Sequence, residues 1–257
     1  MKRILVPTDF TDSSIFAICT AAGLVEKFAA ELILLHVLDE PEDADELAKK
    51  VEKILKLADL QDLNYHYQQV KGDLIESIVN QPSDLIVMGS HGAHGLESFF
   101  IGTNAEKVAK RAECPVVVLK DRTDLTSIDK IVFATNMNRE DDDMIEELKF
   151  IQTHFDSKVH IIKTYDDTLT SHADVEKRLV DFAKFHQITN YEVAAIEGID
   201  EGTLILHYAE QIDAKMILLA THHHRGVDKV FAGHISGEVI NESKIPIWTR
   251  SIEVPSL

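Results

Sequence analysis

The chain has 257 residues, of which 45% are hydrophobic and 27% charged, a balance that is ordinary for globular domains with packed cores. Its formal net charge of −18 argues against nonspecific binding to nucleic acid, because phosphate backbones are bound by basic surfaces. It contains two cysteines and no apolar run long enough to cross a bilayer, so we expect no disulfide framework, no membrane partner and a cytoplasmic location.

The first half of the chain alternates short apolar runs with amphipathic segments. The runs are rich in Val, Ile and Leu, as in strands that are covered on both faces. This alternation predicts an α/β fold: an open, doubly wound, parallel sheet of five strands with helices on both faces. Asp12 and Ser13 offer N-cap chemistry for the first helix. The predicted strands lie near residues 2–7, 32–38, 64–70, 84–88 and 115–119, and the predicted helices near 13–29, 43–59, 73–80 and 103–112.

A glycine-bearing loop follows the fourth predicted strand. Gly89-Ser90-His91-Gly92 is separated by nine residues from Gly102-Thr103, and a helix-like run begins at Asn104. Glycine permits a positive φ and close approach of a ligand to the main chain, and a helix N-terminus adds unpaired N–H donors. The arrangement predicts a cradle for nucleotide phosphates. The alternative is that the glycines only turn the chain between strand and helix.

The loop occurs together with Ile4-Leu5-Val6-Pro7-Thr8-Asp9, a strand that ends in Pro-Thr-Asp, and with a second strand that ends near Val37. In this combination the first half resembles the ATP-binding branch of the universal stress protein family. The resemblance implies ATP or another adenine nucleotide as ligand, with Asp9 against the adenosine moiety and Val37 beside the adenine. Mg²⁺ could accompany the nucleotide. The residues that the resemblance assigns to the nucleotide site are Pro7, Thr8, Asp9, Val37, Met88, Gly89, Gly92, Gly102, Thr103 and Asn104.

The second half repeats the first. The run from Ile4 to Phe10 matches the run from Ile131 to Met137 at an offset of 127. Gly72-Asp73-Leu74-Ile75 matches Gly202-Thr203-Leu204-Ile205 at an offset of 130. Such self-similarity settles the number of domains better than length does. We therefore predict two domains of one fold: residues 1–122, which carry the nucleotide-binding loop, and residues 128–257, in which the loop is degenerate.

Fusion of two copies also bears on assembly. The predicted edge strands at residues 116–118 and 247–248 are apolar and would aggregate if left bare. We expect them to meet across a pseudo-twofold axis, so that one chain mimics a dimer. A further homodimer through other surfaces is left open.

The second loop departs from the first at the positions that matter for phosphate. Gly89 corresponds to Ala220, Gly92 to His223, Thr103 to His234 and Asp9 to Asn136. A side chain in place of glycine opposes a positive φ and blocks close approach of a phosphate. We therefore expect one nucleotide per chain, bound in the first domain.

Histidines make a metal site an alternative for the second domain. His222, His223, His224 and His234 are expected on or beside one loop, and imidazole suits zinc, nickel or copper. Consecutive loop histidines point in different directions, however, and no cysteine or carboxylate completes a fixed spacing, so no metal ligand is assigned.

Three functions follow from these observations. The leading one is a binding module that holds an adenine nucleotide and signals its occupancy to a protein partner of unknown kind or to the other domain. The second is a slow ATPase or self-phosphorylating enzyme with Thr103 as phosphoacceptor, although no P-loop motif and no catalytic residue is identified. The third is a binder of a metal or another small ligand through the second domain.

Overall fold

The computed structural model describes residues 1–38, 44–57, 60, 63–90, 104–137, 142–166, 171–224 and 234–254. The chain divides into two compact units, Met1–Thr126 and Ser127–Leu257, which we call the first and the second unit.

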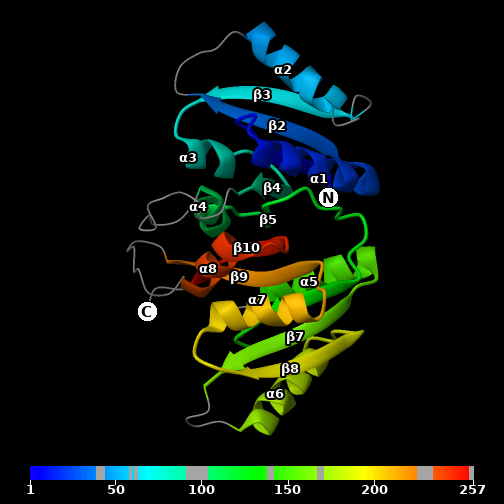
Figure 1. Ribbon diagram of the computed structural model, residues 1–257, viewed down its shortest axis with the longest axis vertical. Coiled ribbons are helices and arrows are strands. Elements are labelled where there is room, and N and C mark those ends of the chain that lie inside the picture. Colours follow the sequence, from blue (N-terminus) through cyan, green and yellow to red (C-terminus); the bar gives the residue numbers. More distant parts are fainter. Residues whose placement is uncertain are drawn as a thin grey trace. The chain divides into compact units, whose positions relative to one another are not determined.

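The first unit is built on five parallel strands in the order β3-β2-β1-β4-β5 (Figure 1). The predicted α/β fold with a parallel sheet is confirmed, because the runs of Val, Ile and Leu form the strands and the amphipathic segments form the helices between them. The strands are β1 (Arg3–Pro7), β2 (Glu31–Leu38), β3 (Tyr65–Lys71), β4 (Leu85–Gly89) and β5 (Val116–Leu119). The helices are α1 (Asp12–Phe28), α2 (Ala44–Leu57), α3 (Leu74–Val79) and α4 (Asn104–Arg111).

The second unit repeats this plan. Its strands are parallel and follow the order β8-β7-β6-β9-β10, which is the order of the first unit strand for strand (Figure 1). The strands are β6 (Lys130–Ala134), β7 (Lys158–Tyr165), β8 (Tyr191–Glu197), β9 (Met216–His224) and β10 (Ile247–Val254). The helices are α5 (Asp142–Phe155), α6 (His172–Phe185), α7 (Glu201–Gln211) and α8 (His234–Glu242).

Helices cover both faces of each sheet, as the continuous apolar strands predict. In the first unit, Leu34 packs among side chains of α1 and α2, whereas the adjacent Leu35 faces α3. In the second unit, Phe133 contacts Phe182 of α6, whereas Lys130 reaches the end of α7. Side chains of a strand alternate between faces, so α1 and α2 lie on the face opposite α3, and α6 lies on the face opposite α7.

The order of the strands creates a switch point in the first sheet. The chain builds outward from β1 through β2 to β3, and then returns to place β4 on the other side of β1. The connections that leave β1 and β4 therefore diverge at the carboxyl ends of these strands. Open parallel sheets bind their ligands in the crevice that this divergence leaves.

Two details of the sequence analysis are corrected by the local geometry. The N-cap of α1 is Thr11 rather than Asp12 or Ser13, and the Thr11 hydroxyl makes no capping bond because it donates to Asp9. Gly72 has its counterpart in Gly198, not in Gly202. Both Gly72 and Gly198 have a positive φ, of 155° and 153°, just before an aspartate N-cap, whereas Gly202 lies inside the first turn of α7.

Among the helices in the described part of the chain, none is both long and apolar enough to span a membrane.

Candidate functional site

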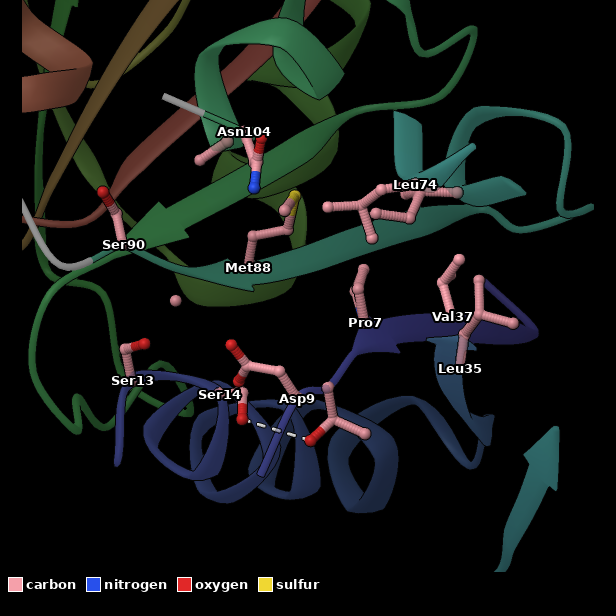
Figure 2. A pocket seen from close by; sticks show the side chains of 14 residues that line it. Pro7, Asp9, Ser13, Ser14, Leu35, Val37, Leu74, Met88, Ser90 and Asn104 are labelled. Carbon is pink, nitrogen blue, oxygen red and sulfur yellow. Dashed lines mark hydrogen bonds between the residues drawn. The ribbon is translucent and has the colours of Figure 1, made fainter. Parts of the chain in front are cut away.

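A pocket of about 260 Å³ opens at the switch point of the first sheet (Figure 2). The carboxyl ends of β1, β2 and β4 supply its floor, and the first turns of α1, α3 and α4 supply its walls. The lining residues are Pro7, Thr8, Asp9, Ser13, Ser14, Leu35, Val37, Leu74, Ile78, Met88, Gly89, Ser90, Asn104 and Ala105.

The pocket has one apolar and one polar end. Figure 2 shows Leu35, Val37 and Leu74 together at one end, beside Pro7. The other end carries the Asp9 carboxylate and three serine hydroxyls, and Met88 lies between the two ends. Leu74 is 36% exposed although it is a large hydrophobic residue, so the apolar end is open to solvent. This division suits a ligand with a flat apolar part and a hydroxylated part.

Asp9 is fixed by the chain that follows it. One carboxylate oxygen, Oδ1, accepts hydrogen bonds from the backbone N–H and the hydroxyl of Thr11, at 3.0 and 2.6 Å. Burial alone would raise the pKa of this carboxyl, but the hydrogen bonds from Thr11, from Ser14 and from the backbone hold the pKa below its usual value. The group is therefore ionised at neutral pH and can only accept hydrogen bonds.

A tight turn carries the chain from β1 to α1. The Thr8 N–H donates to the carbonyl of Leu35 at 2.8 Å, and the Thr8 hydroxyl accepts from the N–H of Phe10 at 3.2 Å. Phe10 takes a φ of 64°, a conformation that residues other than glycine rarely adopt. His36 of β2 contacts the turn, with its Nδ1 2.6 Å from the Thr8 carbonyl oxygen. The turn places Asp9 at the mouth of the pocket.

Gly89 has a packing reason to be glycine. A Cβ atom built on it would lie 2.0 Å from the carbonyl oxygen of Ser13 in α1 and 2.4 Å from the carbonyl carbon. Only a residue without a side chain lets the end of β4 approach α1 this closely. The sequence offers phosphate binding or a turn of the chain as reasons for this glycine, and the structure adds the contact between β4 and α1.

The structure brings together seven of the ten residues that the resemblance assigned to the site. Gly92, Gly102 and Thr103 lie outside the described residues, so their predicted role stays a prediction. Several lining residues escape prediction because they come from helices or from the ends of strands, where spacing alone gives no signal. The seven that line the pocket are Pro7, Thr8, Asp9, Val37, Met88, Gly89 and Asn104, and the missed residues are Ser13, Ser14, Leu35, Leu74, Ile78, Ser90 and Ala105.

The second unit differs at the corresponding edge. β9 does not end at Ala220 but continues to His224, and it pairs with β10 as far as His224 with Val254. The expectation that His222, His223 and His224 lie on a loop is therefore wrong: their backbone is a strand, and His234 begins α8. Within the described residues, no three His, Cys, Asp or Glu side chains gather in a way that could hold a metal ion.

Comparison with known proteins places this fold in a family. The sequence pattern of the universal stress protein family matches residues 1–120 and again residues 127–249. The universal stress protein MJ0531 of Methanocaldococcus jannaschii is 32% identical over 139 residues, which are 46% of this chain and 82% of that protein.

A solved structure shares the arrangement over nearly the whole chain. The crystal structure of a universal stress protein from Archaeoglobus fulgidus DSM 4304 aligns with 97% of this chain and 96% of its own, at 23% identity and a TM-score of 0.75. A universal stress protein solved in complex with cAMP aligns with 51% of this chain and 99% of its own, at 16% identity and a TM-score of 0.37. Because the family pattern matches twice and covers most of the chain, the chain belongs to the universal stress protein family and carries two of its domains in tandem.

Proposed function

We propose that the first unit binds ATP or a related adenine nucleotide in the pocket at the switch point, and that the chain acts in the stress response as a ligand-dependent regulator. One observation carries the proposal: the seven residues named above were selected from the sequence for contact with a nucleotide, and they line a single pocket. That pocket lies at the sheet edge where open parallel sheets bind their ligands.

The division of the pocket supports a nucleoside. The base fits the apolar end, between Val37, Leu35 and Leu74, because a purine ring is flat and buries its faces against aliphatic side chains. The ribose then lies near Asp9. Its hydroxyls can donate, and an ionised carboxylate only accepts, so the two are complementary.

The described lining offers no cationic side chain to the phosphates, since it contains no lysine or arginine. Their charge would be met by backbone N–H groups at the amino ends of α1 and α4, whose first turns line the pocket. Mg²⁺ could share this task, because it is usually bound by phosphate oxygens together with one or two carboxylates. Asp9 is the carboxylate among the described lining residues, and it would supply that contact.

We further propose that one nucleotide binds per chain. In the second unit Asn136 takes the place of Asp9 and Ala220 that of Gly89, and β9 continues as a strand where the first unit leaves β4. Pairing with β10 engages alternate backbone N–H groups of that segment, which are then not free for a phosphate.

Titration calorimetry of the full chain with ATP, ADP, AMP, cAMP and GTP tests both statements. We expect the adenine nucleotides to bind with a stoichiometry near one and GTP to bind more weakly. Asp9→Asn should weaken binding by about tenfold, because a hydrogen bond to a charged group contributes roughly 1.5–3 kcal/mol and an amide keeps part of it. The matched control is Asp12→Asn, which removes the same charge from the same helix start but does not line the pocket. Equal loss in both variants would contradict the assignment of Asp9, and a stoichiometry near two would contradict the single site.

A further inference from the structure

A polar cluster lies under α7 at the amino ends of the strands of the second sheet. His160, the third residue of β7, is only 6% exposed, and its neighbour on β8 in strand register is Glu192. The imidazole Nδ1 lies 3.0 Å from the hydroxyl of Tyr208 in α7 and 3.6 Å from Glu192 Oε2. One ring nitrogen thus faces two partners, of which one belongs to a helix and the other to the sheet.

The cluster fastens the carboxyl end of α7 to the sheet. Tyr208 is in the last turn of α7, and its hydroxyl bond to His160 ties this turn to β7. A second tie lies one turn further on, where Lys130 Nζ donates to the carbonyl of Ile212, the C-cap, at 2.9 Å. The position of this helix end therefore depends on two polar contacts rather than on apolar packing alone.

The first unit has no such cluster at the matching positions. Ile33 pairs with His66 in the register that corresponds to His160 with Glu192, and α3, which corresponds to α7, contains no tyrosine. The fold itself therefore does not require the polar group in this place. The histidine, the carboxylate and the tyrosine belong to the second unit alone.

Hydrogen-bond chemistry allows the cluster two arrangements. When His160 is neutral, the Tyr208 hydroxyl donates to Nδ1 and the proton of the ring is on Nε2. When the ring is protonated, Nδ1 becomes a donor, and the carboxylate of Glu192 is the stronger acceptor. We propose that protonation of His160 transfers its hydrogen bond from Tyr208 to Glu192 and so removes one of the two polar ties between the carboxyl end of α7 and the sheet in mildly acidic conditions.

The charges around His160 determine the pH range. Facing it are Lys158 on its own strand, Lys130 on β6, Glu192 on β8 and Tyr208 on α7, and Glu192 also pairs with Lys158 at 2.5 Å. Burial lowers the pKa of the imidazole, Glu192 raises it, and the two lysines lower it further, with a net decrease. The unfolded chain therefore takes up the proton first, so the stability of the second unit falls as the pH drops below about 6.5 and levels off below the folded pKa.

α7 also contacts α8. A Cβ atom built on Gly202, in the first turn of α7, would lie 2.5 Å from the carboxylate of Glu238 in α8. The two helices are thus in close contact at the amino end of α7. α8 corresponds to α4, which lines the pocket in the first unit.

NMR titration of the full chain from pH 8 to pH 5 tests the proposal, with the His160 signals identified by a His160→Gln variant. We expect the neutral ring to carry its proton on Nε2 and to titrate below about 6.5. Tyr208→Phe should raise the pKa of His160 by half a unit or more, which is roughly a threefold change in the protonation constant, and Glu192→Gln should lower it. The control is Tyr191→Phe, which removes a hydroxyl from β8 at the position before Glu192 and therefore on the other face of the strand.

Hydrogen exchange, corrected for the intrinsic effect of pH, supplies the second readout. Protection of α7 should fall as His160 takes up its proton, whereas in Tyr208→Phe it should already be reduced at pH 8 and change little on acidification. A proton on Nδ1 of the neutral ring, a pKa that Tyr208→Phe and Glu192→Gln leave unchanged, or α7 protection that does not follow the titration would each overturn the proposal.

Discussion

Replacement of Gly89 by alanine should destabilise the first unit and distort its pocket. The added Cβ would lie 2.0 Å from the carbonyl oxygen of Ser13, so β4 and the first turn of α1 must separate by roughly 1 Å to restore an ordinary contact. The obstacle is backbone, which cannot rotate away as a flexible side chain can. Overpacking of this kind costs about 1–3 kcal/mol, and the lower entropy of the unfolded alanine chain returns part of that. We expect a net loss of roughly 1–2 kcal/mol.

Urea unfolding can assign this loss to the correct unit. Trp248 is the single tryptophan of the chain and lies in β10, so its fluorescence reports on the second unit, whereas far-ultraviolet circular dichroism reports on both. With a denaturant slope of 1–2 kcal/mol per molar, Gly89→Ala should move the dichroism transition of the first unit down by about 1 M. The matched change Ala220→Gly in the second unit should cost about 0.5–1 kcal/mol and shift the fluorescence transition. An unshifted dichroism transition in Gly89→Ala would refute the reasoning.

Three further perturbations have clear expected outcomes. Removal of either helix cap, by Asp73→Ala or Asp200→Ala, should cost about 1 kcal/mol each, and only the second should move the fluorescence of Trp248. Thr249→Val should stabilise the second unit by about 1 kcal/mol, because within the described residues the buried hydroxyl has no partner; a lower urea midpoint would show that the hydroxyl is used. Asp84 accepts two N–H bonds from the start of β1. Burial raises its pKa, but these bonds and nearby positive charges outweigh burial, so that the pKa in the folded chain is below its usual value. The stability that Asp84 contributes is therefore present above about pH 4 and is lost as the pH falls through the folded pKa. Asp84→Asn should therefore flatten the decline in stability between pH 5 and pH 3, and an unchanged slope would exclude this role.

The strands and most of the helices could be predicted because the sequence carries their physical causes locally. Runs such as Leu32–Leu35 in β2 and Leu85–Met88 in β4 are continuously apolar, which is typical of strands covered on both faces. Asp9, which follows β1, and Val37, near the end of β2, could be placed at one edge because parallel strands end together. Leu74 and Ile78 could not, since they reach the pocket from α3 and depend on how that helix packs.

The errors have equally physical reasons. Gly202 was matched to Gly72 because the letters that follow are alike, whereas the chain needs its glycine at Gly198, where φ is positive. The run of histidines was assigned to a loop by analogy with the glycine loop of the first half. Its strand conformation depends on pairing with β10, whose partner residues Ile252 to Val254 lie far along the chain and beyond the matched family pattern.

The two copies within one chain help to separate what the fold needs from what a ligand needs. Thr135 repeats the role of Thr8: its hydroxyl accepts from the N–H of Met137 at 2.9 Å, and Met137 takes a φ of 59° as Phe10 takes 64°. Because the turn also occurs in the second unit, which lacks the aspartate, it is needed to lead the chain from strand to helix. Thr8 is therefore a residue of the fold that happens to border the pocket, and the difference between the copies at Asp9 is the one that bears on chemistry. By the same comparison, the cluster around His160 has no counterpart that the fold would require, and its buried imidazole depends on the hydrogen bond from Tyr208 to offset the cost of leaving water.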